Sequence, residues 1–217
     1  MLINLRNALM AGKKSPLPPG ARWVEYLQST GTQWIDTGIL ASSNLNDAQI
    51  DITYMSPVTS VGDLYIFGGG NTYGTAIQAV VSTHTGYLNV SWGQSIQEGD
   101  AYQSNVVANL RMNYNDWMVT FGTTVRSGAF TATSRTFSER NIYLFRLNRA
   151  SGGINTNKDL RIYGFKLSRD GALVRDFRSI AIGTTGYMLD LVSGEHLPYG
   201  NKGTGDFVIG PDIPSPV

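Results

Sequence analysis

The sequence predicts an all-β fold: a jelly-roll sandwich of two antiparallel sheets, preceded by a short N-terminal arm. Two observations predict it. From Trp23 onward, apolar side chains recur at every second position in many short runs, which is the period of a half-buried strand. Residues that favour turns, mainly Gly, Asn, Asp and Ser, separate these runs at short intervals, as they do in sandwiches. No run after Trp23 has a convincing helical period, and no internal repeat divides the chain.

The first two strands of this region are expected on either side of a turn at residues 29–31. Tyr26 fits the first strand, and Trp34 and Ile35 fit the second. Asp36 precedes a Thr and a Gly, a setting in which an aspartate side chain commonly closes an Asx turn. We therefore interpret this stretch as structural rather than catalytic.

The later strands follow the same period. Gln49–Met55 alternates polar and apolar side chains. Asp170-Gly171 interrupts the stretch from Lys158 to Phe177 and predicts a hairpin there, because Asp-Gly tolerates the positive φ of tight hairpin turns. The other runs that fit strands are Asp63–Phe67, Ala76–Val81, Gly86–Trp92, Trp117–Phe121, Asn141–Leu147, Tyr187–Leu191 and Asp206–Gly210.

The N-terminal residues 1–20 differ from the rest. Their apolar side chains are spaced as on one face of a short helix, and an isolated helix of about ten residues is marginal in water. The residues of this stripe are Leu2, Ile3, Leu5, Leu9 and Met10. A Pro-rich linker follows at 15–20. We expect residues 1–20 to form an arm that docks on a neighbouring chain, 21–213 the sandwich, and 214–217 a tail.

The composition excludes several partners. The net charge is +1 and no long basic run exists, which argues against nucleic acid. No apolar run approaches the roughly 18 residues of a membrane span. The chain has no cysteine, which excludes thiolate catalysis and disulfides. Charged residues make up only 15% of the chain. The surface must therefore be rich in hydroxyl and amide groups.

Several stretches resemble a known family in the expected order. Residues 26–38, YLQSTGTQWIDTG, are similar to the opening motif of phage and prophage virion-associated proteins that carry a laminin-G-like (concanavalin-A-like) jelly roll. Further matches are Asn141–Phe145, Arg161–Leu167, Leu173–Phe177, Tyr187–Gly194 and Gly203–Pro211. The resemblance spans roughly residues 23–211 and is weakest over 55–135.

The resemblance implies a non-enzymatic structural protein of a bacteriophage virion, made in the host cytoplasm. It would decorate the capsid, form part of a head fibre or belong to the tail. Its arm would bind other virion proteins, and copies of the chain would form a homo-oligomer. The fold itself decides little about function, because it carries lectins, glycosidases, adhesins and inert modules alike.

No catalytic machinery is visible in the sequence. A glycosidase needs two carboxylates flanking the scissile bond, and only Glu98-Gly99-Asp100 brings two together, in a turn-like stretch. His84 and His196 have no partner nearby in sequence. We therefore predict that the protein is not an enzyme and uses no cofactor, although a glycan hydrolase stays open as an alternative.

Calcium binding is a separate hypothesis. Laminin-G-like domains often bind Ca²⁺ at one edge of the sandwich through aspartate and backbone oxygens. The candidate ligands in this sequence are Asp36, Asp63 and Asp116.

Ligand binding is better supported than catalysis. Sugar sites combine an aromatic platform with amide and hydroxyl groups, a mixture that also serves protein recognition. The candidate residues, in or near expected loops, are Asn71, Tyr73, Tyr87, Trp92, Tyr102 and Trp117. Trp92 and Trp117 end expected strands, so burial in the core is the alternative for both. Three functions stay open: a displayed module or tail adhesin that binds host glycans, a decorative protein without a ligand, and the hydrolase.

Overall fold

The computed structural model describes residues 17–56, 62–71, 73–82, 86–98, 103–152, 158–193 and 198–215, apart from the side chains of Tyr73 and Gln97. The expected N-terminal stripe, from Leu2 to Met10, lies outside these residues. The same holds for His84, Tyr102 and His196.

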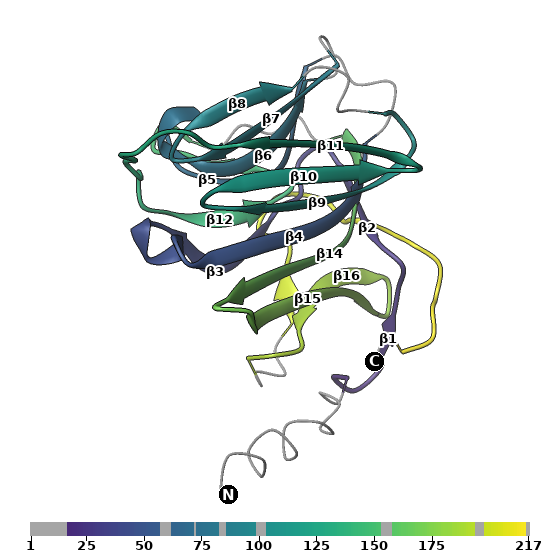
Figure 1. The fold of residues 1–217 in the computed structure, drawn as a ribbon. Coiled ribbons are helices and arrows are strands. Elements are labelled where there is room, and N and C mark those ends of the chain that lie inside the picture. The colour runs from purple at the N-terminus through teal and green to yellow at the C-terminus, as the bar shows by residue number, and fades with distance from the viewer. Residues whose placement is uncertain are drawn as a thin grey trace, which may run out of the picture.

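Two stacked sheets form the body of the molecule (Figure 1). The large sheet runs in the order β11 (Thr124–Ala129), β10 (Asp116–Phe121), β9 (Val107–Asn113), β4 (Ala48–Met55), β14 (Lys158–Arg169), β15 (Ala172–Ile182), β16 (Thr185–Asp190) and β17 (Tyr199–Gly200). Three short strands join this sheet: β1 (Ala21–Trp23) pairs with β15, and β2 (Leu27–Thr30) pairs with β14 and β18 (Val208–Ile209).

The small sheet runs in the order β3 (Ile35–Ala41), β12 (Arg140–Leu144), β5 (Asp63–Gly69), β6 (Ile77–Ser82), β7 (Tyr87–Trp92) and β8 (Ser95–Glu98). Short 3₁₀ helices lie at Ser43–Leu45 and Tyr73–Thr75. Pairing is antiparallel except for β13 (Leu147–Asn148), which pairs with β5 in parallel. The chain crosses between sheets repeatedly, as from β3 to β4 to β5. The predicted fold class, an all-β jelly-roll sandwich of two antiparallel sheets, is confirmed.

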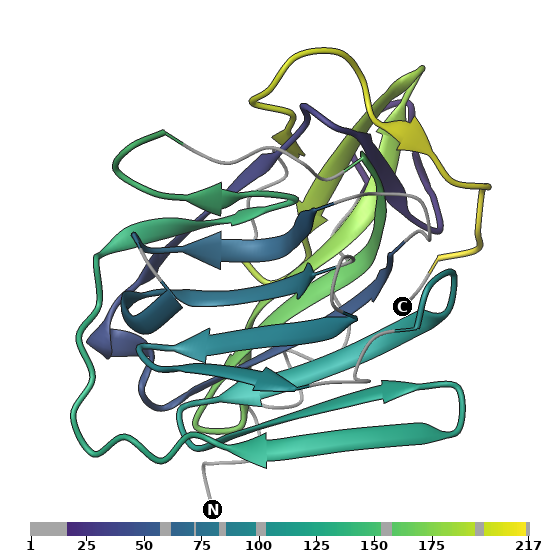
Figure 2. The same cartoon turned by 90° about the horizontal axis from the view of Figure 1, so that it is seen from above.

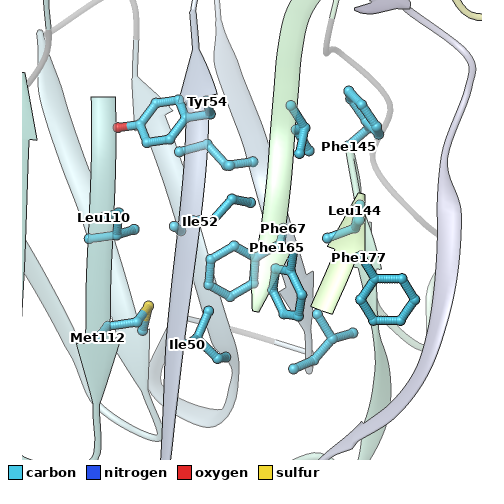
Figure 3. Close-up of a cluster of buried hydrophobic side chains, with 14 of the residues drawn as sticks. Ile50, Ile52, Tyr54, Phe67, Leu110, Met112, Leu144, Phe145, Phe165 and Phe177 are labelled. Atoms are coloured by element: carbon cyan, nitrogen blue, oxygen red, sulfur yellow. The ribbon is translucent and has the colours of Figure 1, made fainter. Parts of the chain in front are cut away.

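The core lies between the sheets and follows from the period of two. On β4, Ile50 and Ile52 point inward and are buried, while the residues between them point outward. Figure 3 shows aromatic side chains from the two sheets meeting there: Phe67 of β5 packs edge-to-face on Phe165 of β14, with ring centroids 5.7 Å apart. Full burial of such a side chain contributes about 1.5–3 kcal/mol. Burial of many such side chains stabilises the contact between the two layers.

The first and last described segments run side by side. Val24 forms a bridge to Asp212, and β18 pairs with β2. Figure 2 shows the same neighbours, with the yellow C-terminal strand next to the purple N-terminal segment. Both segments lie at the Ile182 end of β15, because Ala21 pairs with Ile182. The turn between β14 and β15 lies at the other end of β15, about 33 Å away at the usual rise per residue.

The stretch from Tyr26 to Gly38 is structural, as predicted. The side chain of Gln33 is buried and accepts a hydrogen bond from Thr30 N at 2.7 Å. Asp36 Oδ1 accepts one from Gly38 N at 2.9 Å and so closes the expected Asx turn. The predicted hairpin at Asp170-Gly171 is also confirmed, and both residues have positive φ, 49° and 74°.

Candidate functional site

The outer surface of the large sheet carries a set of polar side chains that we call the polar face. Its residues alternate with core residues along their strands, so the sheet itself aims them at solvent. The polar face comprises Gln49, Asp51 and Thr53 of β4, Asn109 and Arg111 of β9, Thr120 of β10, Gly164, Lys166 and Ser168 of β14, and Asp176 and Arg178 of β15.

The strand register sets these residues in rows across the sheet. Gly164 lies between Arg178 and Thr53, and Thr53 lies opposite Asn109, which in turn faces Thr120. Five neighbouring strands at about 4.8 Å spacing make such a row about 19 Å long. Gly164 has no side chain and forms the low point of the row.

Two hollows occupy this surface. One, of about 450 Å³, is lined by residues that include Thr53, Gly164 and Arg178. The other, of about 210 Å³, is lined by residues that include Asn109 and Thr120. Asp51 and Thr53 line both, so the two hollows lie next to each other. A ligand lying along the row would contact strands β15 to β10.

Carboxylates and cations alternate across the strands of the polar face, where Lys166 lies between Asp176 and Asp51, and Asp51 lies opposite Arg111. Asp176 accepts a hydrogen bond from Arg178 Nε at 2.6 Å, and Lys166 Nζ lies 4.0 Å from its other oxygen. Asp51 accepts a hydrogen bond from Gln49 Nε2 at 2.8 Å. Because both signs of charge are interspersed in this way, no large field of one sign covers the face, and the hydroxyl and amide groups are available for recognition.

Thr53 and Asn109 form the central polar pair. Thr53 Oγ1 donates a hydrogen bond to Asn109 Oδ1 at 2.7 Å across the strands. This bond fixes the amide so that its Nδ2 group points away from Thr53, and Nδ2 has no partner among the described residues. The pair therefore presents a donor to whatever occupies the hollow.

A third hollow, of about 370 Å³, lies where three turns meet at the β14–β15 end of the sheet. Its lining includes Asn46, Gln49, Asn115 and Ser168. Ser168 also lines the hollow over Gly164, so the polar face extends to this end. The third hollow lies at the end of β14 and β15 that is opposite to the first described strand, β1.

An ion pair stiffens the rim of this third hollow. Arg169 Nη2 and Nε contact Asp47 Oδ2 and Oδ1 at 2.9 and 3.1 Å. The hydrogen bond from Arg169 holds the pKa of Asp47 below its usual range, and Asp47 raises the pKa of Arg169 in return. The pair ties the turn before β4 to the turn after β14.

An aromatic pair bounds the polar face on the side of the chain ends. The rings of Tyr26 and Tyr163 meet edge-to-face at 5.4 Å, and the Arg161 guanidinium lies 4.5 Å from the Tyr26 ring centroid. Burial raises the pKa of the Tyr163 phenol. The polar face therefore ends at the aromatic rings of Tyr26 and Tyr163.

The predicted ligand residues are not brought together. Trp92 and Trp117 point into the core and are 0% exposed, which corrects their assignment to a binding surface: each shares the inward parity of its strand. Tyr87 is 40% exposed at the start of β7, whereas Asn71 lies at the far end of the neighbouring strands. Asn71 Oδ1 accepts a hydrogen bond from Ala150 N at 2.8 Å. The side chains of Tyr73 and Tyr102 lie outside the described part of the chain.

The three calcium candidates lie on separate elements. Asp36 is on β3 and accepts a hydrogen bond from Asn141 Nδ2 at 3.1 Å. Asp63 begins β5, and Asp116 begins β10 on the other sheet, where Arg111 contacts it at 3.4 Å. Within the described ranges, no three His, Cys, Asp or Glu side chains are grouped so that they could hold a metal ion. Calcium binding stays an untested prediction.

Of the carboxylates considered for catalysis, Glu98 is the last residue of β8, and its neighbours Gly99 and Asp100 lie outside the described residues. In the ranges that the structure covers, no helix is long and apolar enough to span a membrane.

Sequence reasoning missed the polar face. The alternating polar residues of Gln49–Met55 indicate that one side of this strand faces solvent, and that side forms part of the polar face. What the period could not show is that Thr53, Asn109 and Gly164 become neighbours, because that depends on the order of strands in the sheet.

Comparison of the sequence with protein-family models finds no match, and comparison with curated proteins finds no significant match. Among solved structures, the fold is similar to the CBM40 of the IT-sialidase of Ruminococcus gnavus, at 13% identity and a TM-score of 0.49, covering 67% of this chain and 90% of that one.

Two further structures are more distant. Domains LG4-5 of the mouse laminin alpha1 chain match at 13% identity and a TM-score of 0.43, over 75% of this chain and 45% of theirs. The botulinum neurotoxin serotype D binding domain matches at 9% identity and a TM-score of 0.42, over 85% and 60%. Likeness at this level does not extend to function, and none of the three indicates a phage or a virion.

Proposed function

We propose that the protein is a non-enzymatic binding module, displayed on the surface of a phage virion, whose polar face binds a neutral glycan. The single observation that carries the binding part is the pair of adjacent hollows on either side of the Thr53–Asn109 pair. Their lining combines hydroxyl and amide groups with carboxylates and cations that alternate across the strands. A ligand rich in hydroxyl groups and without charge matches this lining.

The engagement of its carboxylates favours binding over hydrolysis. A glycosidase keeps one carboxyl group protonated as the acid and a second free as the base or nucleophile. On the polar face, Asp176 is held by two cations, and Asp51 accepts a hydrogen bond from Gln49.

The virion part of the proposal rests on the sequence resemblance of residues 23–211. The arm at 1–20 would dock on other virion proteins, and copies of the chain would form a homo-oligomer. The positions of the chain ends and of the third hollow support display. The first described strand, β1, lies at the Ile182 end of β15, and the third hollow lies at the other end. An arm anchored on the side of β1 would therefore leave the hollow facing outward. A tail adhesin that binds a host receptor is the alternative, and it differs in its location on the particle.

A glycan array tests the binding function directly. Gly164→Thr places a side chain in the hollow over Gly164, where a new Cβ meets its nearest neighbour at 3.4 Å, so the variant should fold. We expect the unaltered chain to bind neutral glycans and Gly164→Thr to lose at least tenfold in affinity. Gly74→Ala, at a position with open space, is the matched control and should bind normally.

Two outcomes would overturn the proposal: no retained glycan on the array, or equal retention by Gly164→Thr. Release of reducing sugar from a bound polysaccharide would favour the hydrolase instead. Gold labelling of purified particles then places the protein on the capsid or the tail, and absence from particles would refute the virion role alone.

A further inference from the structure

We infer that the ligand of the polar face is a linear, uncharged oligosaccharide that runs along strands β4 and β14, with one end in the third hollow. This inference rests on the proposed function and adds the length of the ligand, its direction on the sheet and a second subsite. β4 and β14 lie side by side in the large sheet (Figure 1), and residues of both strands line the hollow over Gly164 and the third hollow.

The register of the two strands builds a path between these hollows. Three pairs of residues, one from each strand, follow one another on the outer side of the sheet: Thr53 opposite Gly164, Asp51 opposite Lys166, and Gln49 opposite Ser168. We call these three pairs the polar track. Ser168 lines both hollows, so they adjoin at the last pair. At the usual rise per residue, Gly164 and Ser168 are about 13 Å apart, which is longer than a single sugar ring.

The polar track offers hydrogen-bonding groups at each step. Gln49 Nε2 donates to Asp51 at 2.8 Å, which leaves Gln49 Oε1 without a partner among the residues that the structure describes. The hydroxyl group of Ser168 is also without a partner there. Asp51 and Lys166 are opposite in charge as well as in register, so they add an acceptor and donors without a net charge. A sugar hydroxyl both donates and accepts, so successive sugar residues can bind along the whole track.

The third hollow has the size and the amide groups for one end of such a chain. Its volume is about 370 Å³ and that of the hollow over Gly164 about 450 Å³. Both lie within the range of ligand pockets, roughly 300–1,000 Å³. Asn46 and Asn115 line the third hollow from two different turns, and both side chains are exposed. Within the described ranges, neither side-chain amide makes a hydrogen bond, so both are available to a ligand.

Tyr114 supplies the aromatic surface of this end subsite. The Arg135 guanidinium lies 3.6 Å from the centroid of the Tyr114 ring and covers one of its faces. Arg135 also donates a hydrogen bond to the carbonyl group of Tyr114, so the ring is held in place. The rest of the ring is available to the third hollow, which Tyr114 lines. An aromatic ring beside amide groups can bind the apolar face and the polar rim of a sugar.

Two subsites joined by a track make affinity depend on the length of the ligand. Once one end of a chain is bound over Gly164, binding of the other end in the third hollow is intramolecular, and the overall affinity exceeds that of either end alone. A disaccharide is too short to fill both hollows. We therefore expect affinity to rise with chain length and to level off when the chain spans the polar track.

Titration calorimetry with the full chain tests the inference, using laminari-, cello- and manno-oligosaccharides from the disaccharide to the hexasaccharide. We expect at least one series to bind, with the hexasaccharide at least about tenfold tighter than the disaccharide. Asn46→Leu should lose this gain, because it removes an amide and fills part of the third hollow. The position is exposed and has ordinary helical dihedrals, φ −64° and ψ −22°, so the variant should fold.

Asn44→Leu is the matched control. Asn44 is exposed in the same short 3₁₀ helix and does not line the third hollow, so its variant should keep the full gain with length. Asn115→Ala is a second, independent variant, which removes the other amide from the third hollow and should weaken binding of the hexasaccharide severalfold. The melting temperature of each variant shows that it is folded.

Two results would overturn the inference: a hexasaccharide that binds no tighter than the disaccharide, or a gain with length that survives both Asn46→Leu and Asn115→Ala. The second result would place the extension of the ligand toward Asn109 instead. Failure of the proposed function looks different. Disaccharide binding that Gly164→Thr abolishes, without any dependence on length, refutes the end subsite alone, whereas no binding at any length refutes both.

Discussion

Gln33 Nε2 donates a hydrogen bond to Thr204 O at 2.8 Å, across 171 positions of sequence. This bond joins two of the sequence motifs, residues 26–38 and 203–211. Thr32 Oγ1 donates to the same carbonyl at 2.6 Å, and Asn201 Oδ1 accepts a hydrogen bond from Trp34 N. These motifs therefore hold the first and last described segments together.

The first prediction concerns the same contact between residues 32–34 and 201–204. A Cβ on Gly203 would lie 1.8 Å from Thr32 O, which no side-chain movement can relieve because the contact is with backbone. We expect Gly203→Ala to lower the free energy of unfolding by about 3 kcal/mol, the upper end of the cost of overpacking. Urea denaturation measures this loss. Gly74→Ala has open space around it and serves as the control. Equal stability of the two variants would contradict a stabilising role for the contact between residues 32–34 and 201–204.

A second prediction concerns Asp190, which is buried. Its Oδ1 accepts hydrogen bonds from Asp176 N at 3.0 Å and Val192 N at 3.1 Å, and Arg175 Nε lies 3.4 Å from Oδ2. Asp190→Ala leaves two backbone donors without their acceptor and the Arg175 guanidinium without its counter-charge. We expect it to lose about 3 kcal/mol of stability, as when one partner of a buried pair is removed.

Asp190→Asn is the informative companion, because its amide oxygen can still accept the two backbone hydrogen bonds. It should lose clearly less stability than Asp190→Ala in the same urea titration. If both variants lose the same amount, the charge pairing with Arg175 matters and the backbone bonds do not.

The third prediction is a dependence on pH. Arg169 lowers the pKa of Asp47 in the folded protein, so the folded state favours the ionised carboxylate. Its contribution to stability is fully present above the unfolded pKa, about 3.9. It is lost as the pH falls through the lowered folded value. The melting temperature of Asp47→Asn should lie slightly below that of the unaltered chain at pH 7, and the two should converge toward pH 2. A difference that persists at pH 2 would show that the ion pair is not its cause.

The strands could be predicted from the sequence because their period of two is local. Gln49–Met55 and the hairpin at Asp170-Gly171 needed only neighbouring residues. The same parity would have placed Trp92 in the core, since it continues the inward series of Leu88 and Val90. Its position at the end of an expected strand left burial in the core open, and the structure confirms that alternative.

The sites needed more than local pattern. The polar face depends on β4 lying between β9 and β14, so that Thr53 meets Asn109 and Gly164. Nothing in the spacing of these residues specifies that order.

The fourth prediction concerns Arg135, which pins the segment between β11 and β12. Its guanidinium carbon lies 3.6 Å from the centroid of the Tyr114 ring, and its nitrogens donate hydrogen bonds to the carbonyl groups of Tyr114 and Phe130, the latter at 3.3 Å. Burial lowers the pKa of this group, which shows that it is partly removed from water. Tyr114 also lines the third hollow, so the contacts of Arg135 with Tyr114 support the wall of that hollow.

We expect Arg135→Ala to lose about 2 kcal/mol of stability, since both a stacked cation and charged hydrogen bonds disappear. Arg135→Lys should recover little of the loss, because a lysine keeps the charge but not the planar fork that reaches two carbonyl groups. Hydrogen exchange adds a local readout: the amide of Phe130, which donates to Asn115 O at 2.8 Å, should exchange faster in both variants. Arg126→Ala, on the exposed edge strand β11, is the control and should leave this amide protected. Full recovery by Arg135→Lys would mean that the charge alone holds the segment, and the geometric argument would fail.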